Sequence, residues 1–270
     1  MPTQNGVDAP DTLAELLGAA HVVGGYTRIT SLLTGPGAVS HTAIHPAVQG
    51  TGVLECSAPW AGEELARAAA VWEVRARARA LKSRHSRAPA EACRVHEPRG
   101  QSAQRSPFLR LVVEEDVLLS MWRKLTIMAA YSTVTALGRC PIGPIVSSPD
   151  ARNVLLQCMR ETVAVARAVG VRMTDADVDG ALAILESLPP GCTPSMMRDL
   201  TAGRPSELDD QAGAVVRIGA KHAVPLPVLG SLYALLRPQE RATRGELVMP
   251  VMLDCDVGEP REWHFIEYHI

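Results

Sequence analysis

Apolar residues recur at helical spacing through the second half of the chain, and capping residues, Gly and Pro interrupt them at intervals typical of a helical domain. The pattern predicts six helices: from Glu114 to Leu137, from the N-cap Ser148 to Gly170, from near Thr174, from Thr193-Pro194, from Ser206 with Asp209 in a capping box, and from beyond Pro227 to about Pro238. Their connections are short. We therefore expect an all-α domain over residues 109–241.

The first part of the chain, residues 1–56, mixes helix and strand signals. A short helix is predicted from Pro10 to Gly18, because Pro suits a first helical turn and Gly a helix end. His21 to Leu33 is rich in Val, Ile and Thr and predicts a strand interrupted by a glycine pair. The turn Gly35-Pro36-Gly37 leads into a returning strand from Ala38 to Ile44. These few strands need further strands beside them to form a stable sheet.

Residues 57–108 form a third kind of sequence. Arginines are dense between residues 75 and 105, apolar periodicity fades beyond Val74, and prolines break what remains. This composition predicts an irregular, poorly ordered insertion. The tail, residues 242–270, has no clear pattern. The predicted fold class is therefore α+β and mostly α.

The composition is that of an ordinary globular protein. Of 270 residues, 47% are hydrophobic and 21% charged, and the net charge of −2 gives no general attraction to nucleic acid or membrane. The uncharged stretch from Leu125 to Gly138 is shorter than the roughly 20 residues of a membrane span. The cysteines are scattered, and no signal-peptide pattern follows Met1. We expect reduced thiols and a cytoplasmic location.

Three short motifs in the helical half carry the most specific information. They are W-x-K-L at Trp122–Leu125, S-M-x-x-D at Ser195–Asp199, and Ser206-Glu207-Leu208 after a Gly-Arg-Pro loop. In this order they resemble the C-terminal domain of the ketopantoate reductases, and the resemblance runs from about Glu115 to Glu240. A shorter match at Gln4–Val7, Gly24-Gly25, Pro36-Gly37 and His41 resembles the last third of that family's nucleotide-binding domain.

The resemblance implies a fold and an activity. The fold would be the end of a Rossmann-type NADP-binding domain followed by a helical domain of the 6-phosphogluconate-dehydrogenase type. The activity would be NADPH-dependent reduction of a 2-keto acid, either 2-dehydropantoate to pantoate or a related substrate. A homodimer is a further expectation, and neither nucleic acid nor a membrane is an expected partner.

The resemblance also implies site residues. Lys124 matches the family's proton-donating lysine, a role that an ammonium can fill and a guanidinium cannot. Glu207 matches a glutamate that orients the lysine and ligands, and Asn5 an asparagine between cofactor and substrate. Ser195 matches a substrate-binding serine, and Ser132 is a second substrate-binding candidate two helical turns beyond Lys124. Singly, such residues are more often a surface lysine, a first-turn serine and a helix-dipole glutamate.

Two features depart from the family pattern. Better-known members carry asparagines four and eight residues after the lysine, where this chain has Met128 and Ser132. The phosphate-binding motif G-x-G-x-x-G of a Rossmann domain is absent. The missing motif and the sequence of residues 57–108, which does not resemble the family, together predict an N-terminally truncated or frame-shifted homologue. The alternative function is then an inactive helical module that only folds or dimerises.

Two other readings have less support in the sequence. An arginine-rich nucleic-acid binder would use residues 75–105, but that stretch lacks interleaved aromatic residues and a recognisable fold. His41 and His45 are four residues apart, but their segment is predicted to be extended, and no acid or cysteine completes a ligand set. We therefore expect no metal site.

Overall fold

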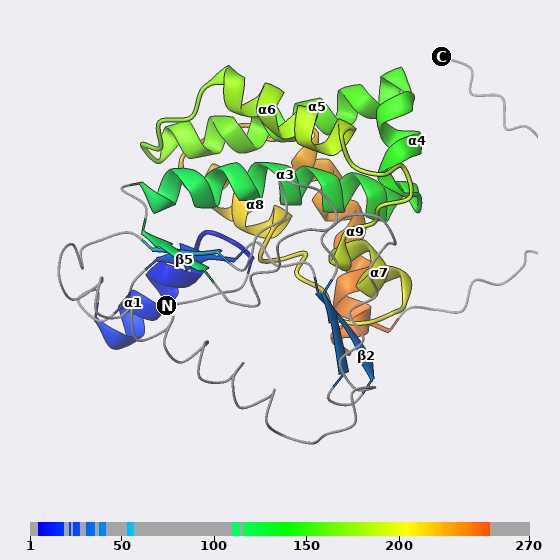
Figure 1. Cartoon of the computed structure of the whole chain (residues 1–270), viewed down its shortest axis with the longest axis horizontal. Helices are drawn as coiled ribbons and strands as arrows, with labels where there is room; N and C mark the ends of the chain where they lie inside the picture. Colours follow the sequence, from blue (N-terminus) through cyan, green and yellow to red (C-terminus); the bar gives the residue numbers. More distant parts are fainter. Residues whose placement is uncertain are drawn as a thin grey trace, which may run out of the picture.

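The computed structural model describes two parts of the chain. In the first half it describes residues 5–18, 22, 24–27, 31–35, 38–41, 53–56 and 110–113, and in the second half residues 116–248. In the second half, seven helices form one body: α3 (Val117–Gly138), α4 (Ile142–Ser147), α5 (Pro149–Ala168), α6 (Asp175–Glu186), α7 (Ser195–Thr201), α8 (Ala212–Lys221) and α9 (Leu229–Thr243). Figure 1 shows α3 running through the middle of this body, with α5 and α6 on one side and α8 on the other.

Helix α3 is the centre of the packing, and most of its residues are buried. It contacts each of the other six helices, and its buried residues occur on every side of the helix. The carboxylate of Asp116 accepts a hydrogen bond from the Leu119 backbone N–H at 3.1 Å and caps its start. Within the helix, the buried hydroxyls of Thr126 and Thr135 donate to carbonyl oxygens four residues back. These bonds allow polar residues in a dry core.

The strands form two small sheets beside the helical body. β1 (Gly25–Tyr26), β4 (Val53–Cys56) and β5 (Arg110–Val113) make a sheet of order β1-β4-β5, antiparallel between β1 and β4 and parallel between β4 and β5. β2 (Ser31–Gly35) and β3 (Ala38–His41) form an antiparallel hairpin. The helix α1 (Ala9–Leu17) ends at Gly18, as its sequence predicts. β1 contacts α3, so this sheet is joined to the centre of the helical body.

The predicted fold class is confirmed: the protein is α+β and mostly helical. The predicted hairpin around the Gly-Pro-Gly turn is confirmed by the pairing of β2 with β3. The predicted insertion at 57–108 and the tail beyond residue 248 lie outside the described residues. Within the described residues, no helix is long and apolar enough to cross a membrane.

Three details of the helical prediction are wrong. α8 begins at Ala212 instead of Ser206, because the Ser206 hydroxyl donates to Glu240 instead of closing a capping box. α9 continues through Pro238 to Thr243, and its last turn is held by hydrogen bonds that the Glu240 carboxylate accepts from Ser206 and Arg244. The six predicted helices omit α4, a short segment that depends on backbone hydrogen bonds to residues 190 and 192.

A glycine at the start of α4 is required by close packing. A Cβ on Gly143 would lie 2.6 Å from the Cβ and 2.9 Å from the carbonyl oxygen of Pro190. We expect Gly143→Ala to lower the free energy of unfolding by about 1–3 kcal/mol, as overpacking against backbone does. Chemical denaturation would measure the change.

Gly180 in α6 provides the matched control, since it is exposed and a Cβ there would meet nothing within 4 Å. Gly180→Ala should raise the free energy of unfolding by about 0.5–1 kcal/mol through helix propensity. Equal effects of the two substitutions would contradict the packing at Pro190.

Candidate functional site

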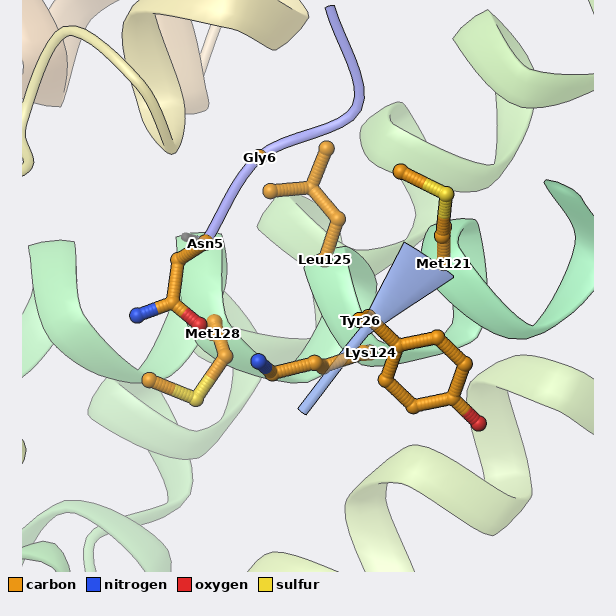
Figure 2. Close-up of a pocket in the computed structure, with 7 residues that line it drawn as sticks. All are labelled: Asn5, Gly6, Tyr26, Met121, Lys124, Leu125 and Met128. Atoms are coloured by element: carbon orange, nitrogen blue, oxygen red, sulfur yellow. The ribbon is translucent and has the colours of Figure 1, made fainter. Parts of the chain in front are cut away.

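One small pocket lies where the N-terminal segment, β1 and α3 meet. Its lining residues are Asn5, Gly6, Tyr26, Met121, Lys124, Leu125 and Met128. Figure 2 shows Asn5 and Lys124 on the same side of the pocket as Met128. The enclosed cavity has a volume of about 10 Å³, enough for about one water molecule. Its polar groups come from the N-terminal segment and from α3, which are far apart in the sequence, so the pocket exists only in the folded protein.

Lys124 is positioned by the strand β1 and the residue that follows it. Its Nζ donates a hydrogen bond to the backbone carbonyl of Thr27 at 2.7 Å. The same nitrogen lies 5.9 Å from the centroid of the Tyr26 ring, within the range of a cation–π contact. Tyr26 is fully buried, so its ring is a fixed wall. The geometry holds one ammonium group at the edge of the pocket.

Asn5 is held by the carboxylate of Glu207. Its Nδ2 donates to Glu207 Oε2 at 2.7 Å, and Gln211 Nε2 donates to the same oxygen at 3.0 Å. Bonds from an amide to a carboxylate are stronger than bonds between neutral groups. This pair of bonds fixes the N-terminal segment against the turn between α7 and α8.

The backbone of the N-terminal segment lies directly on that turn. Gly6 has φ +118°, and a Cβ there would lie 2.9 Å from the carbonyl oxygen of Asp210. Both the backbone conformation and the close approach therefore require glycine. Two residues further on, the Asp8 carboxylate pairs with the Arg217 guanidinium at 2.7 Å.

The turn carries an excess of carboxylates beside the pocket. Burial raises the pKa of Asp210, and the charges of Asp8 and Glu207 raise it further, while Arg217 and Arg244 act in the opposite direction. The Lys124 ammonium lines the pocket and would attract an anionic group of a ligand.

The structure brings together some of the predicted site residues. Lys124 and Asn5 both line the pocket, and Glu207 is bonded directly to Asn5. Ser132 is fully buried, and its hydroxyl has no hydrogen-bond partner among the described residues. Ser195 is the exposed first residue of α7. Neither serine is among the lining residues, and their substrate-binding roles stay predictions.

Sequence reasoning missed several pocket residues. Met121 and Leu125 share a face of α3 with Lys124 and with Met128, which the sequence had indicated, and the spacing of three to four residues was a usable signal. Gln211 follows Glu207 by four residues, but the segment is not helical there. Tyr26 carried no signal, because its place depends on the pairing of β1 with β4.

The residues of the site fit one end of a nicotinamide cofactor. The amide of Asn5, the ammonium of Lys124 and the ring of Tyr26 are groups of the kinds that contact a flat, polar ring and a small carboxylate. The sequence contains no G-x-G-x-x-G, the motif that holds the phosphates of the cofactor in a Rossmann domain. Among the described residues, no cluster of His, Cys, Asp and Glu could hold a metal ion.

Two family patterns match the chain in order. "Ketopantoate reductase PanE/ApbA C terminal" matches residues 116–240, and "Ketopantoate reductase PanE/ApbA" matches residues 1–52. A 2-dehydropantoate 2-reductase of Pyrobaculum aerophilum is 34% identical over 48% of this chain and 47% of its own length. One from Caulobacter vibrioides is 37% identical over 47% of this chain and 43% of its own length. The chain thus spans about half the length of these curated relatives.

Solved structures match over more of the chain. A PanE/ApbA family ketopantoate reductase from Ralstonia eutropha has a TM-score of 0.67 and 26% identity, over 90% of this chain and 67% of its own. A D-mandelate dehydrogenase bound to NADH and anilino(oxo)acetate has a TM-score of 0.64 at 20% identity. The match covers 90% of this chain and 67% of the dehydrogenase, which therefore shares the fold. The two family patterns together cover more than half of the 270 residues. The chain therefore belongs to the ketopantoate reductase family.

Proposed function

We propose that this chain carries the proton-donating and substrate-binding side of a nicotinamide-dependent reductase that acts on a 2-keto acid. The observation that carries the proposal is the meeting of Lys124 and Asn5 in one pocket, with Glu207 bonded to Asn5. These residues stand in the order of the family motifs. The P. aerophilum and C. vibrioides relatives are named 2-dehydropantoate 2-reductases, which supports this reaction class.

The proposed chemistry divides between the cofactor and the chain. When bound, the reduced nicotinamide supplies a hydride to the ketone carbon. Lys124 Nζ donates a proton to the carbonyl oxygen as negative charge develops there, which completes the alcohol. The Thr27 carbonyl aims the amine, and Glu207 orients the amide of Asn5. The carboxylate of the keto acid lies toward the ammonium, away from the carboxylates near Asp210.

We propose NADPH as the cofactor on the strength of the family alone. A fluorescence titration of the purified chain with NADPH tests this directly. Saturable binding at about micromolar concentrations supports the reductase proposal. No binding up to about millimolar NADPH, by a protein with the helical circular-dichroism spectrum of this fold, favours the inactive homologue instead.

A dimeric ketopantoate reductase from Staphylococcus aureus shares the fold, so sedimentation in the same buffer tests for a homodimer.

Replacing the proposed acid with a group that keeps its charge isolates proton transfer. We expect Lys124→Arg to lower kcat about 10²- to 10⁴-fold, because a guanidinium cannot lose its proton near neutral pH. Steady-state reduction of 2-dehydropantoate would measure it. Lys221→Arg is the control, since Lys221 is an exposed residue at the end of α8. Unchanged kcat in Lys124→Arg would exclude Lys124 as the acid.

The lining of the pocket also predicts substrate preference. Met128 is partly exposed beside Lys124 and presents a thioether and a methyl group to the pocket. We expect apolar 2-keto acids such as 2-oxo-4-methylpentanoate to be preferred over the hydroxylated 2-dehydropantoate. Met128→Asn should reduce this ratio of kcat/KM about tenfold, while Met128→Leu should keep it. An unchanged ratio in Met128→Asn would mean that Met128 does not face the substrate.

A further inference from the structure

A buried carboxylate on α9 holds the residue that precedes Glu207. Glu240 is 1% exposed. Its two oxygens accept hydrogen bonds from the Ser206 backbone N–H at 3.1 Å each, and Oε2 accepts another from the Ser206 hydroxyl at 2.6 Å. Arg244 Nε donates to Oε1 at 2.7 Å. A carboxylate so far from water is stable only with such a complete set of donors.

The same cluster satisfies the remaining polar groups of Ser206. An Arg244 Nη2 donates to the Ser206 carbonyl at 2.8 Å, and the Ser206 hydroxyl accepts from the Leu208 N–H at 3.2 Å. We call Ser206, Glu240 and Arg244 the Ser206 clamp. The backbone N–H, the carbonyl and the hydroxyl of Ser206 are all held by it or by Leu208, so the residue cannot rotate without breaking buried hydrogen bonds.

The clamp acts on the turn that precedes α8. The Gln211 N–H donates to the Glu207 carbonyl at 3.0 Å within this turn, but the helix itself begins only at Ala212, so Ser206 and Glu207 lie outside it. Glu207 is the residue bonded to Ser206, and its carboxylate must reach both Asn5 and Gln211. Within such a turn, a shift of about 1 Å in the backbone would break a 2.7 Å contact with Asn5.

We propose that Glu240 and Arg244 are positioning residues, which fix the turn at Ser206 so that Glu207 holds Asn5 at the pocket. Nothing in the family motifs assigns this role, and the catalytic meaning of the inference rests on the proposed function. The geometric part of the inference stands apart from it. The clamp connects the last turn of α9 to the N-terminal segment through two hydrogen-bonded carboxylates.

The competing explanation is that Glu240 only fastens α9 to the body. The chain offers a matched control at the other end of the same helix. Glu161 accepts hydrogen bonds from the backbone N–H groups of Val228 and Leu229, each at 2.8 Å. Leu229 and Glu240 lie about 16 Å apart along the helix at 1.5 Å per residue. Glu161→Gln therefore disturbs α9 without touching the turn at Ser206.

The decisive experiment compares Glu240→Gln with Glu161→Gln in the full chain, by ¹⁵N NMR of the Asn5 and Gln211 side-chain amides. Glu207→Gln removes the carboxylate acceptor and defines the shift for full loss. We expect Glu240→Gln to move both amides at least halfway to that position, and Glu161→Gln to leave them in place. If the two amide signals of Glu240→Gln keep their wild-type positions while its thermal stability falls as in Glu161→Gln, Glu240 only attaches α9 to the helical body. That outcome would overturn the proposal.

Ser206 supplies milder variants in case Glu240→Gln fails to fold. Ser206→Ala loses the hydroxyl bonds and should shift both amides, whereas Ser206→Thr keeps a hydroxyl and should restore them. Equal spectra for Ala and Thr at the wild-type position would again overturn the proposal.

In the activity assay, Glu240→Gln should lower kcat about tenfold relative to Glu161→Gln. If the wild-type chain shows no turnover, the proposed function fails, and the amide shifts still decide whether the clamp positions Glu207.

Discussion

The whole helical body depends on the burial of α3. Its long uncharged stretch has no face that suits water, so it must be surrounded, and each of the other six helices contacts it. The buried hydroxyls of Thr126 and Thr135 are satisfied along the helix itself. Lys124 lies toward the start of this helix, where the sheet and the N-terminal segment meet it. A rigid, buried helix is therefore what presents the ammonium to the pocket.

The second constraint is the packing of the N-terminal segment against residues about 200 positions later in the chain. Asn5 bonds to Glu207, Gly6 lies against the Asp210 carbonyl, and Asp8 pairs with Arg217. The first two interactions are short-range contacts that tolerate little displacement, while the exposed ion pair contributes little by itself. The pocket thus lies between two segments that are distant in the sequence, the N-terminal segment with β1 and the helix α3.

Buried or half-buried carboxylates attach both ends of α9 to the rest of the helical body. Glu161 receives the first N–H groups of α9, and Glu240 secures its last turn to Ser206. Glu161 accepts from backbone N–H groups that the start of α9 leaves unsatisfied, and Glu240 accepts from the backbone N–H of Ser206 in the turn before α8. The continuation of α9 past Pro238 follows from the second of these, because tertiary bonds offset a local sequence preference against helix.

The sequence by itself determined the fold class, the course of most helices and the hairpin at residues 31–41, because periodicity, glycines and prolines act locally. It also determined the family, through motifs that include Lys124, Asn5 and Glu207. Only the tertiary structure decided that Ser206 is clamped instead of capping a helix, that α4 forms, and that Tyr26 and Gln211 adjoin the site. Those outcomes depend on partners tens to hundreds of residues away, which no local pattern encodes.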